Sequence, residues 1–311
     1  MPTTPTEDAS IKSAQADNFD RLNEVVAGTA FDRHLRFLNF GYRPAPGEDP
    51  AGPRLGFAFP NKDSAQLLFQ TIGDVPLAGA RLVEVGCGRG GNLWLARRYL
   101  GPAEVVGVDI AAGSIRYCAE ANPGPGACFV VGDAEELPLA AATADVVLSI
   151  ESGATYPDIE RFFAEVARLL RPGGTFCYAD IVHHELVEPY VGLLASLGLE
   201  PLVQRDITAN VTAARDERAA RQQLAFAAAD DADRATMAEF SGTTDSVLYH
   251  QFADGDHRYV LGRFRRTEAP PVGPLRLTDE QRTLARATAT IAVDALTMSS
   301  AGTDRREVDR A

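Results

Sequence analysis

The chain has 311 residues, 45% of them hydrophobic and 23% charged, so it carries enough apolar material for a substantial core. Its 30 basic and 43 acidic residues give a formal net charge of -13, which disfavours binding to nucleic acid and to anionic lipid. We find no signal-peptide pattern and no apolar run long enough to cross a bilayer. We therefore expect a cytoplasmic protein without membrane insertion.

Residues 1–60 are predicted to form a polar tail, a helix and a lid. The first dozen residues are polar and rich in Pro and Thr, as mobile chain ends often are. Apolar residues at helical spacing begin at Phe19 and lead to the aromatic cluster of Phe37, Phe40 and Tyr42. The segment 43–60, rich in Pro and Gly, is predicted to be a loop.

Residues 61–183 show strands that alternate with helices. Apolar runs predict strands at 81–85, 104–108, 128–131, 144–150 and 175–181. Helices are expected at 65–72, after the first strand, at 114–120 and at 159–170. This alternation predicts a parallel sheet covered by helices on both faces.

The remaining chain adds three predicted segments. Residues 184–245 are expected to form a helical cap insertion, with a helix at 189–197, a short strand at 202–206 and helical sequence from 209 to about 240. Residues 246–267 hold a closing strand at 259–264. Residues 268–311 are expected to form a helix at 278–296, opened by the capping pattern of Thr278 and Gln281, and a flexible tail. Exchange of the terminal helices between subunits could give a homo-oligomer.

The four cysteines show no paired metal-ligand spacing. They are Cys87, Cys118, Cys128 and Cys177, and all lie in segments that we expect to form core. We therefore expect buried thiols in a reduced compartment, no disulfide framework and no bound metal.

A glycine-rich turn, Glu84-Val85-Gly86-Cys87-Gly88-Arg89-Gly90-Gly91, lies between the first strand of the sheet and the next helix. Such a turn lets backbone approach a ligand closely and presents the N–H groups of a helix N-terminus. Gly86, Gly88 and Gly91 also satisfy the dinucleotide pattern G-x-G-x-x-G, so the glycines alone leave NAD open as the cofactor.

Three carboxylates near strand ends bear on the choice between S-adenosylmethionine (SAM) and NAD. Glu84 precedes the glycine turn, where a carboxylate suits the ammonium group of an amino acid better than a pyrophosphate. Asp109 ends the second strand, where it can reach the ribose hydroxyls of either cofactor. Asp133, followed by Ala134, ends the third strand and could bind the adenine edge.

Two further segments belong to the same pattern, Asp145-Val-Val-Leu148 and Leu169-Leu-Arg-Pro-Gly-Gly174. Together with the glycine turn and the strand-end carboxylates, they make residues 81–180 resemble the class I SAM-dependent methyltransferases, in which such motifs occur in this order and at about this spacing. The resemblance implies a Rossmann-like α/β fold with a seven-stranded, mostly parallel sheet and an antiparallel last strand. It also implies that Gly86 and Gly88 approach the methionine part of SAM, that Asp109 binds the ribose and that Asp133 with Ala134 binds the adenine. The expected cofactor-binding residues are Glu84, Gly86, Cys87, Gly88, Asn92, Asp109, Ile110, Asp133, Ala134, Glu135, Ile150 and Glu151.

Residues 147–158, 176–180 and 205–211 are similar to small-molecule methyltransferases of secondary metabolism and lipid tailoring, including phthiotriolone-type O-methyltransferases and terpenoid C-methyltransferases. Where the lipid enzymes carry Ser-His-Cys-Tyr-Pro, this chain has Gly153-Ala154-Thr155-Tyr156-Pro157. A mechanism based on a histidine in that loop therefore does not carry over to this chain.

Residues that follow strands four and five are the first candidates for catalysis, because ligands of open α/β sheets bind outside the carboxyl ends of the strands. His183 and His184 are candidate bases, since histidine commonly serves as a base near neutral pH. Glu151 is the competing base, because burial beside apolar walls would raise its pKa. The expected acceptor-binding residues are Phe37, Phe40, Tyr42 and Tyr156.

The sequence thus predicts methylation of a hydroxyl on an apolar small molecule, with SAM as donor. The alternative within this fold is C-methylation of a prenyl or other electron-rich carbon. The alternatives from other classes are an NAD-dependent oxidoreductase and a non-catalytic SAM-binding protein.

Overall fold

A computed structural model of the protein describes residues 5–27, 32, 35–56, 59, 61–226, 255–268, 273 and 275–308. One seven-stranded sheet forms its centre, in the order β3-β2-β1-β4-β5-β7-β6. β1 to β5 pair in parallel, whereas β7 runs antiparallel to both β5 and β6. The strands are β1 (Arg81–Val85), β2 (Glu104–Asp109), β3 (Ala127–Val131), β4 (Ala144–Ile150), β5 (Leu170–His183), β6 (Leu199–Asp206) and β7 (His257–Arg266).

The central strands are apolar on both faces. In β1, Leu82, Val83 and Val85 are at most 1% exposed, which explains why apolar residues dominate this strand in the sequence. The predicted class I fold with its antiparallel last strand is confirmed. β5 is longer than predicted: it includes the Pro172-Gly173-Gly174 segment, and its register with β4 shifts between Ala144 and Val146.

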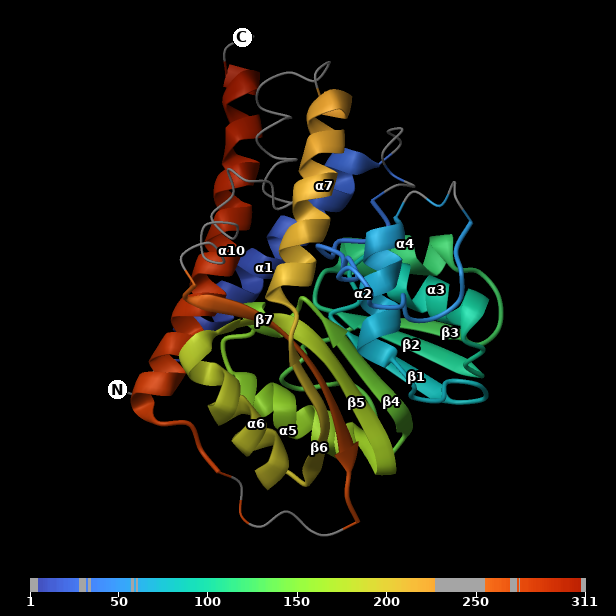
Figure 1. Ribbon diagram of the computed structural model, residues 1–311. Coiled ribbons are helices and arrows are strands. Elements are labelled where there is room, and N and C mark those ends of the chain that lie inside the picture. The colour runs from blue at the N-terminus through green and yellow to red at the C-terminus, as the bar shows by residue number, and fades with distance from the viewer. Residues whose placement is uncertain are drawn as a thin grey trace.

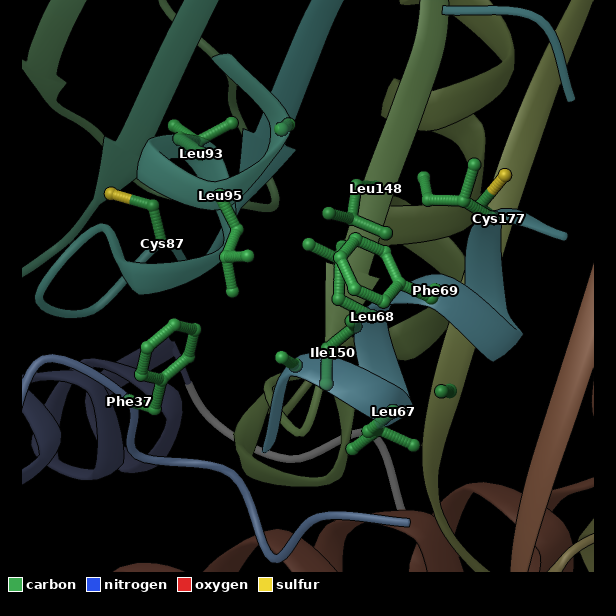
Figure 2. Close-up of a cluster of buried hydrophobic side chains, with 14 of the residues drawn as sticks. Phe37, Leu67, Leu68, Phe69, Cys87, Leu93, Leu95, Leu148, Ile150 and Cys177 are labelled. Atoms are coloured by element: carbon green, nitrogen blue, oxygen red, sulfur yellow. The ribbon is translucent and has the colours of Figure 1, made fainter. Parts of the chain in front are cut away.

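Helices cover the two faces of the sheet as separate layers (Figure 1). On one face pack α2 (Lys62–Ile72), α3 (Gly91–Tyr99), α4 (Ala112–Ala121) and the start of α7 (Thr208–Phe226). Figure 2 shows Leu68 and Phe69 of α2 beside Leu148 and Ile150 of β4 on this face. On the opposite face pack α5 (Ile159–Leu169), α6 (Val187–Ser196) and the first part of α10 (Asp279–Val308).

The two terminal helices lie side by side (Figure 1). α1 (Pro5–Val26) contacts α10 through a hydrogen bond of 3.1 Å from Asn18 Nδ2 to the carbonyl of Val293, and through an ion pair of 2.9 Å between Asp8 and Arg286. The expectation of a mobile segment over the first dozen residues is wrong from Pro5 onward, because this stretch is helical and packs on other elements. Residues 1–4 lie outside the described part of the chain.

The C-terminal helix begins as predicted. The Thr278 hydroxyl accepts a hydrogen bond from the Gln281 N–H at 3.2 Å, and the Gln281 side chain accepts one from the Thr278 N–H at 2.9 Å. α10 then continues to Val308, past the predicted end at 296. Residues 227–254, which include part of the predicted cap insertion, lie outside the described residues.

Cys87, Cys118 and Cys177 are buried, but Cys128 is exposed on the edge strand β3, which corrects the expectation that all four thiols are buried. All four are unpaired. None of the described helices is both long and apolar enough to cross a membrane.

Candidate functional site

A cavity lies at the carboxyl ends of the parallel strands. Its walls are the glycine turn after β1, the ends of β2 and β4, the segment 36–40, residues 180–181 of β5, and parts of α1 and α10. With the exception of Glu135, every residue of the expected cofactor-binding set lines this cavity. Of the expected acceptor-binding residues, Phe37, Phe40 and Tyr156 line it as well.

The glycine turn keeps its backbone close to the opposite wall of the cavity. Gly86 has a φ of +72°, a left-handed conformation that strains any residue with a side chain. A Cβ atom on Gly86 would lie 2.3 Å from Cβ of Ser152 and 2.7 Å from the hydroxyl of Tyr156. The N–H of Gly88 donates to Oδ2 of Asp109 at 2.7 Å, which ties the turn to β2.

Glu84 is almost fully buried, at 1% exposure. Its Oε1 accepts a hydrogen bond of 2.7 Å from Nδ2 of Asn92, whereas its buried Oε2 has no hydrogen-bond partner among the described residues. Burial raises the pKa of Glu84 to about 8. A buried carboxyl oxygen without a partner, on the wall of a cavity, fits the ammonium group of an amino acid.

The two strand-end aspartates are both hydrogen-bonded. Oδ1 of Asp109 accepts from the Ala111 N–H at 2.9 Å, and burial raises the pKa of Asp109. Asp133 Oδ1 accepts from the Glu135 N–H at 2.9 Å, and its Oδ2 pairs with Nζ of Lys12 at 2.7 Å. Both side chains therefore have fixed positions at the rim of the cavity.

Glu135 is not part of the cavity wall. Its carboxylate is buried, pairs with Lys12 at 2.5 Å and accepts from the Asp158 N–H at 2.7 Å. The expectation that Glu135 contacts the cofactor is therefore not supported by its position. Its contacts fix α1 and the start of α5 to the loop after β3.

Glu151 follows β4 and has a φ of +53°, which is rare for a residue with a side chain and typical of strained functional positions. Its Oε1 accepts two hydrogen bonds of 2.7 Å, from the Phe40 N–H and from the Tyr259 hydroxyl. Removal from bulk water raises the pKa of Glu151 to about 7, although both hydrogen bonds favour the charged form. Glu151 is thus a carboxyl group inside the cavity that can exchange a proton near neutral pH.

Asp180 is fully buried and also faces the cavity. It accepts from the Gly153 N–H at 2.6 Å and from the Ser152 N–H at 3.2 Å. Burial raises the pKa of Asp180 to about 7. Because these hydrogen bonds hold the loop that follows Glu151, Asp180 has a positioning role.

His183 and His184 do not line the cavity. β5 continues through His183, so the strand has passed the cavity by the time it reaches the two histidines. The His183 ring packs against His184 and His257, with centroid distances of 4.6 and 5.3 Å, and His184 is exposed. The catalytic role expected for these histidines is not supported by their position.

Tyr42 also lies outside the cavity and is fully buried. Its hydroxyl donates to Glu48 Oε1 at 2.5 Å and accepts from Nη2 of Arg205 at 3.1 Å. Tyr42 therefore fixes the segment that follows Phe40 to β6, and it does not face an acceptor.

Sequence reasoning missed three residues that position the site. Lys12 lay in the expected mobile tail, and Tyr259 was treated only as part of a closing strand. Arg89 of the glycine motif is buried at 1% exposure, hydrogen-bonds to Asn23 and stacks on the Tyr117 ring at 3.6 Å. The available signal in the sequence was the long charged side chain of Arg89 within the glycine turn. Such a side chain needs partners, and here α1 supplies one through Asn23.

Comparison with known proteins agrees with this geometry. Residues 83–178 match the family of methyltransferase domains. The chain is 37% identical over 211 residues to a probable phthiotriol/phenolphthiotriol dimycocerosates methyltransferase 2 of Mycobacterium ulcerans, covering 61% of this chain and 81% of that protein. It is 37% identical over 181 residues to a fatty-acid O-methyltransferase of Mycolicibacterium smegmatis, covering 58% of this chain and 65% of that protein, just under two thirds.

A solved structure shares the fold. It is geranyl diphosphate C-methyltransferase from Streptomyces coelicolor A3(2), in complex with Mg2+, geranyl diphosphate and S-adenosyl-L-homocysteine (SAH). It aligns with a TM-score of 0.59 and 17% identity, covering 86% of this chain and all of that one. Together with the motifs and the sheet order, these relatives show that the chain belongs to the class I SAM-dependent methyltransferases and uses SAM as its cofactor.

Proposed function

We propose that this enzyme transfers the methyl group of SAM to a hydroxyl of an apolar, lipid-like small molecule, with Glu151 as the general base. The single observation that carries the proposal is the position of Glu151. Its carboxyl group lies in the cavity at the carboxyl end of β4, and its pKa is about 7. The names of the two mycobacterial relatives support a lipid-like acceptor.

When bound, SAM supplies a methyl group on a positively charged sulfonium, which is already activated for displacement. Glu84 would hold the ammonium group through Oε2, and Asp109 would hold the ribose hydroxyls. The protein's remaining tasks are to position the nucleophile and to exclude water. Phe37, Phe40 and Tyr156 supply apolar surface for the acceptor.

Glu151 would take the proton of the acceptor hydroxyl as the new bond between oxygen and carbon forms. A base with a pKa near 7 is partly ionised at neutral pH and is strong enough to assist this transfer. The Tyr259 hydroxyl and the Phe40 N–H fix the carboxylate, because both donate to Oε1. Tyr259 and Phe40 thus position the base, and only Glu151 itself would exchange the proton.

C-methylation of a prenyl or other electron-rich carbon is the second candidate. The aromatic rings of Phe37 and Phe40 face the same cavity as Glu151. Aromatic faces stabilise a cation, and a carboxylate could remove a proton after methylation of an alkene.

The test is methyl transfer from SAM labelled with 13C in its methyl group to a panel of long-chain alcohols, phenols, hydroxylated fatty acids and prenyl alcohols. The 13C shift of the product identifies the new bond. A methoxy signal supports the proposal, whereas an aliphatic methyl signal selects C-methylation. An N-methyl product, found when amines are added to the panel, would reject both.

A further inference from the structure

A second cavity of about 450 Å3 lies between α6 and the part of the sheet formed by β5, β7 and β6. This volume falls within the roughly 300–1,000 Å3 range of small-molecule sites. Figure 1 shows α6 against this part of the sheet, on the face opposite α2. The cavity therefore lies between α6 and the sheet, is lined in part by exposed residues such as Glu188 and Asp206, and is separate from the SAM site.

The walls of this second cavity are mostly apolar. Its floor includes Tyr178 of β5 and Phe264 of β7, at 4% and 3% exposure. Its roof includes Val187 and Val191 of α6, which are only partly buried. Polar groups such as Glu188 and Arg258 also contact the cavity. An apolar ligand that covers partly exposed apolar side chains is stabilised, because apolar surface is removed from water.

A small gap of about 10 Å3 lies between this cavity and the SAM site. Ala154, Tyr156, Ile181 and Thr288 line both the gap and the SAM cavity. Tyr178, Val182 and Tyr190 line both the gap and the second cavity. The gap therefore shares wall residues with both larger spaces. It lies between the cavity that contains Glu151 and the second cavity under α6.

From these shared walls we propose that the second cavity binds the unbranched alkyl tail of the acceptor, whose reactive head lies beside Glu151. The proposal rests on the proposed function in one respect, namely that the acceptor is lipid-like. A chain of methylene groups suits the second cavity, because it is unbranched and apolar along its whole length, as most of the walls are. The half-buried ring of Tyr190, which packs on Phe163 at 5.5 Å, would have to rotate to admit the chain.

The test measures binding and needs no methyl transfer. Unbranched fatty acids of 8, 12 and 16 carbons displace cis-parinaric acid, a fluorescent fatty acid, from enzyme saturated with SAH. The wild type is expected to bind the 16-carbon acid at least tenfold more tightly than the 8-carbon acid. Val191→Trp fills the second cavity and should remove this gain, while affinity for the 8-carbon acid changes less than twofold.

Ala195→Trp is the matched control. Ala195 lies on the same helix but is exposed and does not line the cavity. This variant should keep the full dependence on chain length. Equal affinity for the 16-carbon acid in Val191→Trp and wild type, or no dependence on chain length in the wild type, would overturn the proposal.

A second measurement does not depend on the folding of a variant. A 16-carbon fatty acid with a diazirine at its terminal carbon is photolysed in the SAH-bound wild type, and the labelled peptide is identified by mass spectrometry. Label on α6 or β7 supports the tail site, whereas label confined to residues 36–40 rejects it. If the tail site is supported but no hydroxyl is methylated, the proposed function fails alone.

Discussion

The hydroxyl of Tyr259 donates a hydrogen bond of 2.7 Å to Oε1 of Glu151. Tyr259 lies near the start of β7, and Glu151 directly follows the end of β4. The N–H of Phe40 donates to the same oxygen from the segment that covers the cavity. β7 and the segment 36–40 thus meet at one carboxylate, and both stabilise its charged form.

Tyr259→Phe should raise the pKa of Glu151, because it removes a hydrogen bond to the ionised form. A hydrogen bond to a charged group contributes about 1.5–3 kcal/mol, and one pH unit corresponds to about 1.4 kcal/mol, so we expect a shift of roughly one pH unit or more. The acid limb of the kcat/KM profile against pH should move to higher pH. Tyr42→Phe, which removes a buried hydroxyl bonded to Glu48 outside the cavity, should leave the profile unchanged.

Binding of SAH at pH 7 should release a proton. The pKa of Glu84 is about 8 without ligand, so this carboxyl is mostly protonated at pH 7. The ammonium group of SAH favours the charged form and lowers that pKa, and the proton leaves. Calorimetry in buffers of different ionisation enthalpy measures the released fraction. At pH 9, where Glu84 is mostly ionised, the release should be much smaller than at pH 7, and equal release at both pH values would contradict the assignment.

Gly86→Ala should weaken SAH binding at least tenfold and lower the free energy of unfolding. The new Cβ would lie 2.3 Å from Ser152 Cβ, and the φ of +72° adds backbone strain of about 1–2 kcal/mol. Gly173→Ala is the matched control, because Gly173 has a φ of +81° but no atom within 4 Å of a built Cβ. It should show only the strain, measured by chemical denaturation, with SAH affinity unchanged. Equal losses of SAH affinity in Gly86→Ala and Gly173→Ala would mean that the close packing at Gly86 has no role in SAH binding.

Much of the fold was predictable because its strands are short apolar runs bounded by turns. β1 and β4 begin and end at the predicted residues, since both are buried on two faces and are followed by a glycine or a charged residue. β5 was less predictable. Pro172, Gly173 and Gly174 signal a turn locally, and they lie where the register with β4 shifts. β5 nevertheless begins before them, because Leu170 already pairs with Ala144 of β4.

The candidate site was predictable where residues are adjacent in sequence to strand ends, as for Glu84, Asp109 and Glu151. It was not predictable where tertiary packing decides. His183 and His184 follow the fifth strand in the sequence, yet the strand carries them past the cavity. Lys12 bonds to Asp133, which is 121 residues away in the sequence, and Tyr259 bonds to Glu151, which is 108 residues away. No local sequence pattern predicts such contacts.

The most direct test of Glu151 as the base is single-turnover methyl transfer by Glu151→Gln to the best hydroxyl acceptor of the panel. An amide cannot take the proton, although its oxygen can still accept from Phe40 and Tyr259. We predict a rate about 100- to 10,000-fold lower than that of the wild type. SAH affinity should stay within threefold, and His183→Ala and His184→Ala should react at the wild-type rate. A wild-type rate in Glu151→Gln, together with loss of activity in either histidine variant, would contradict the account.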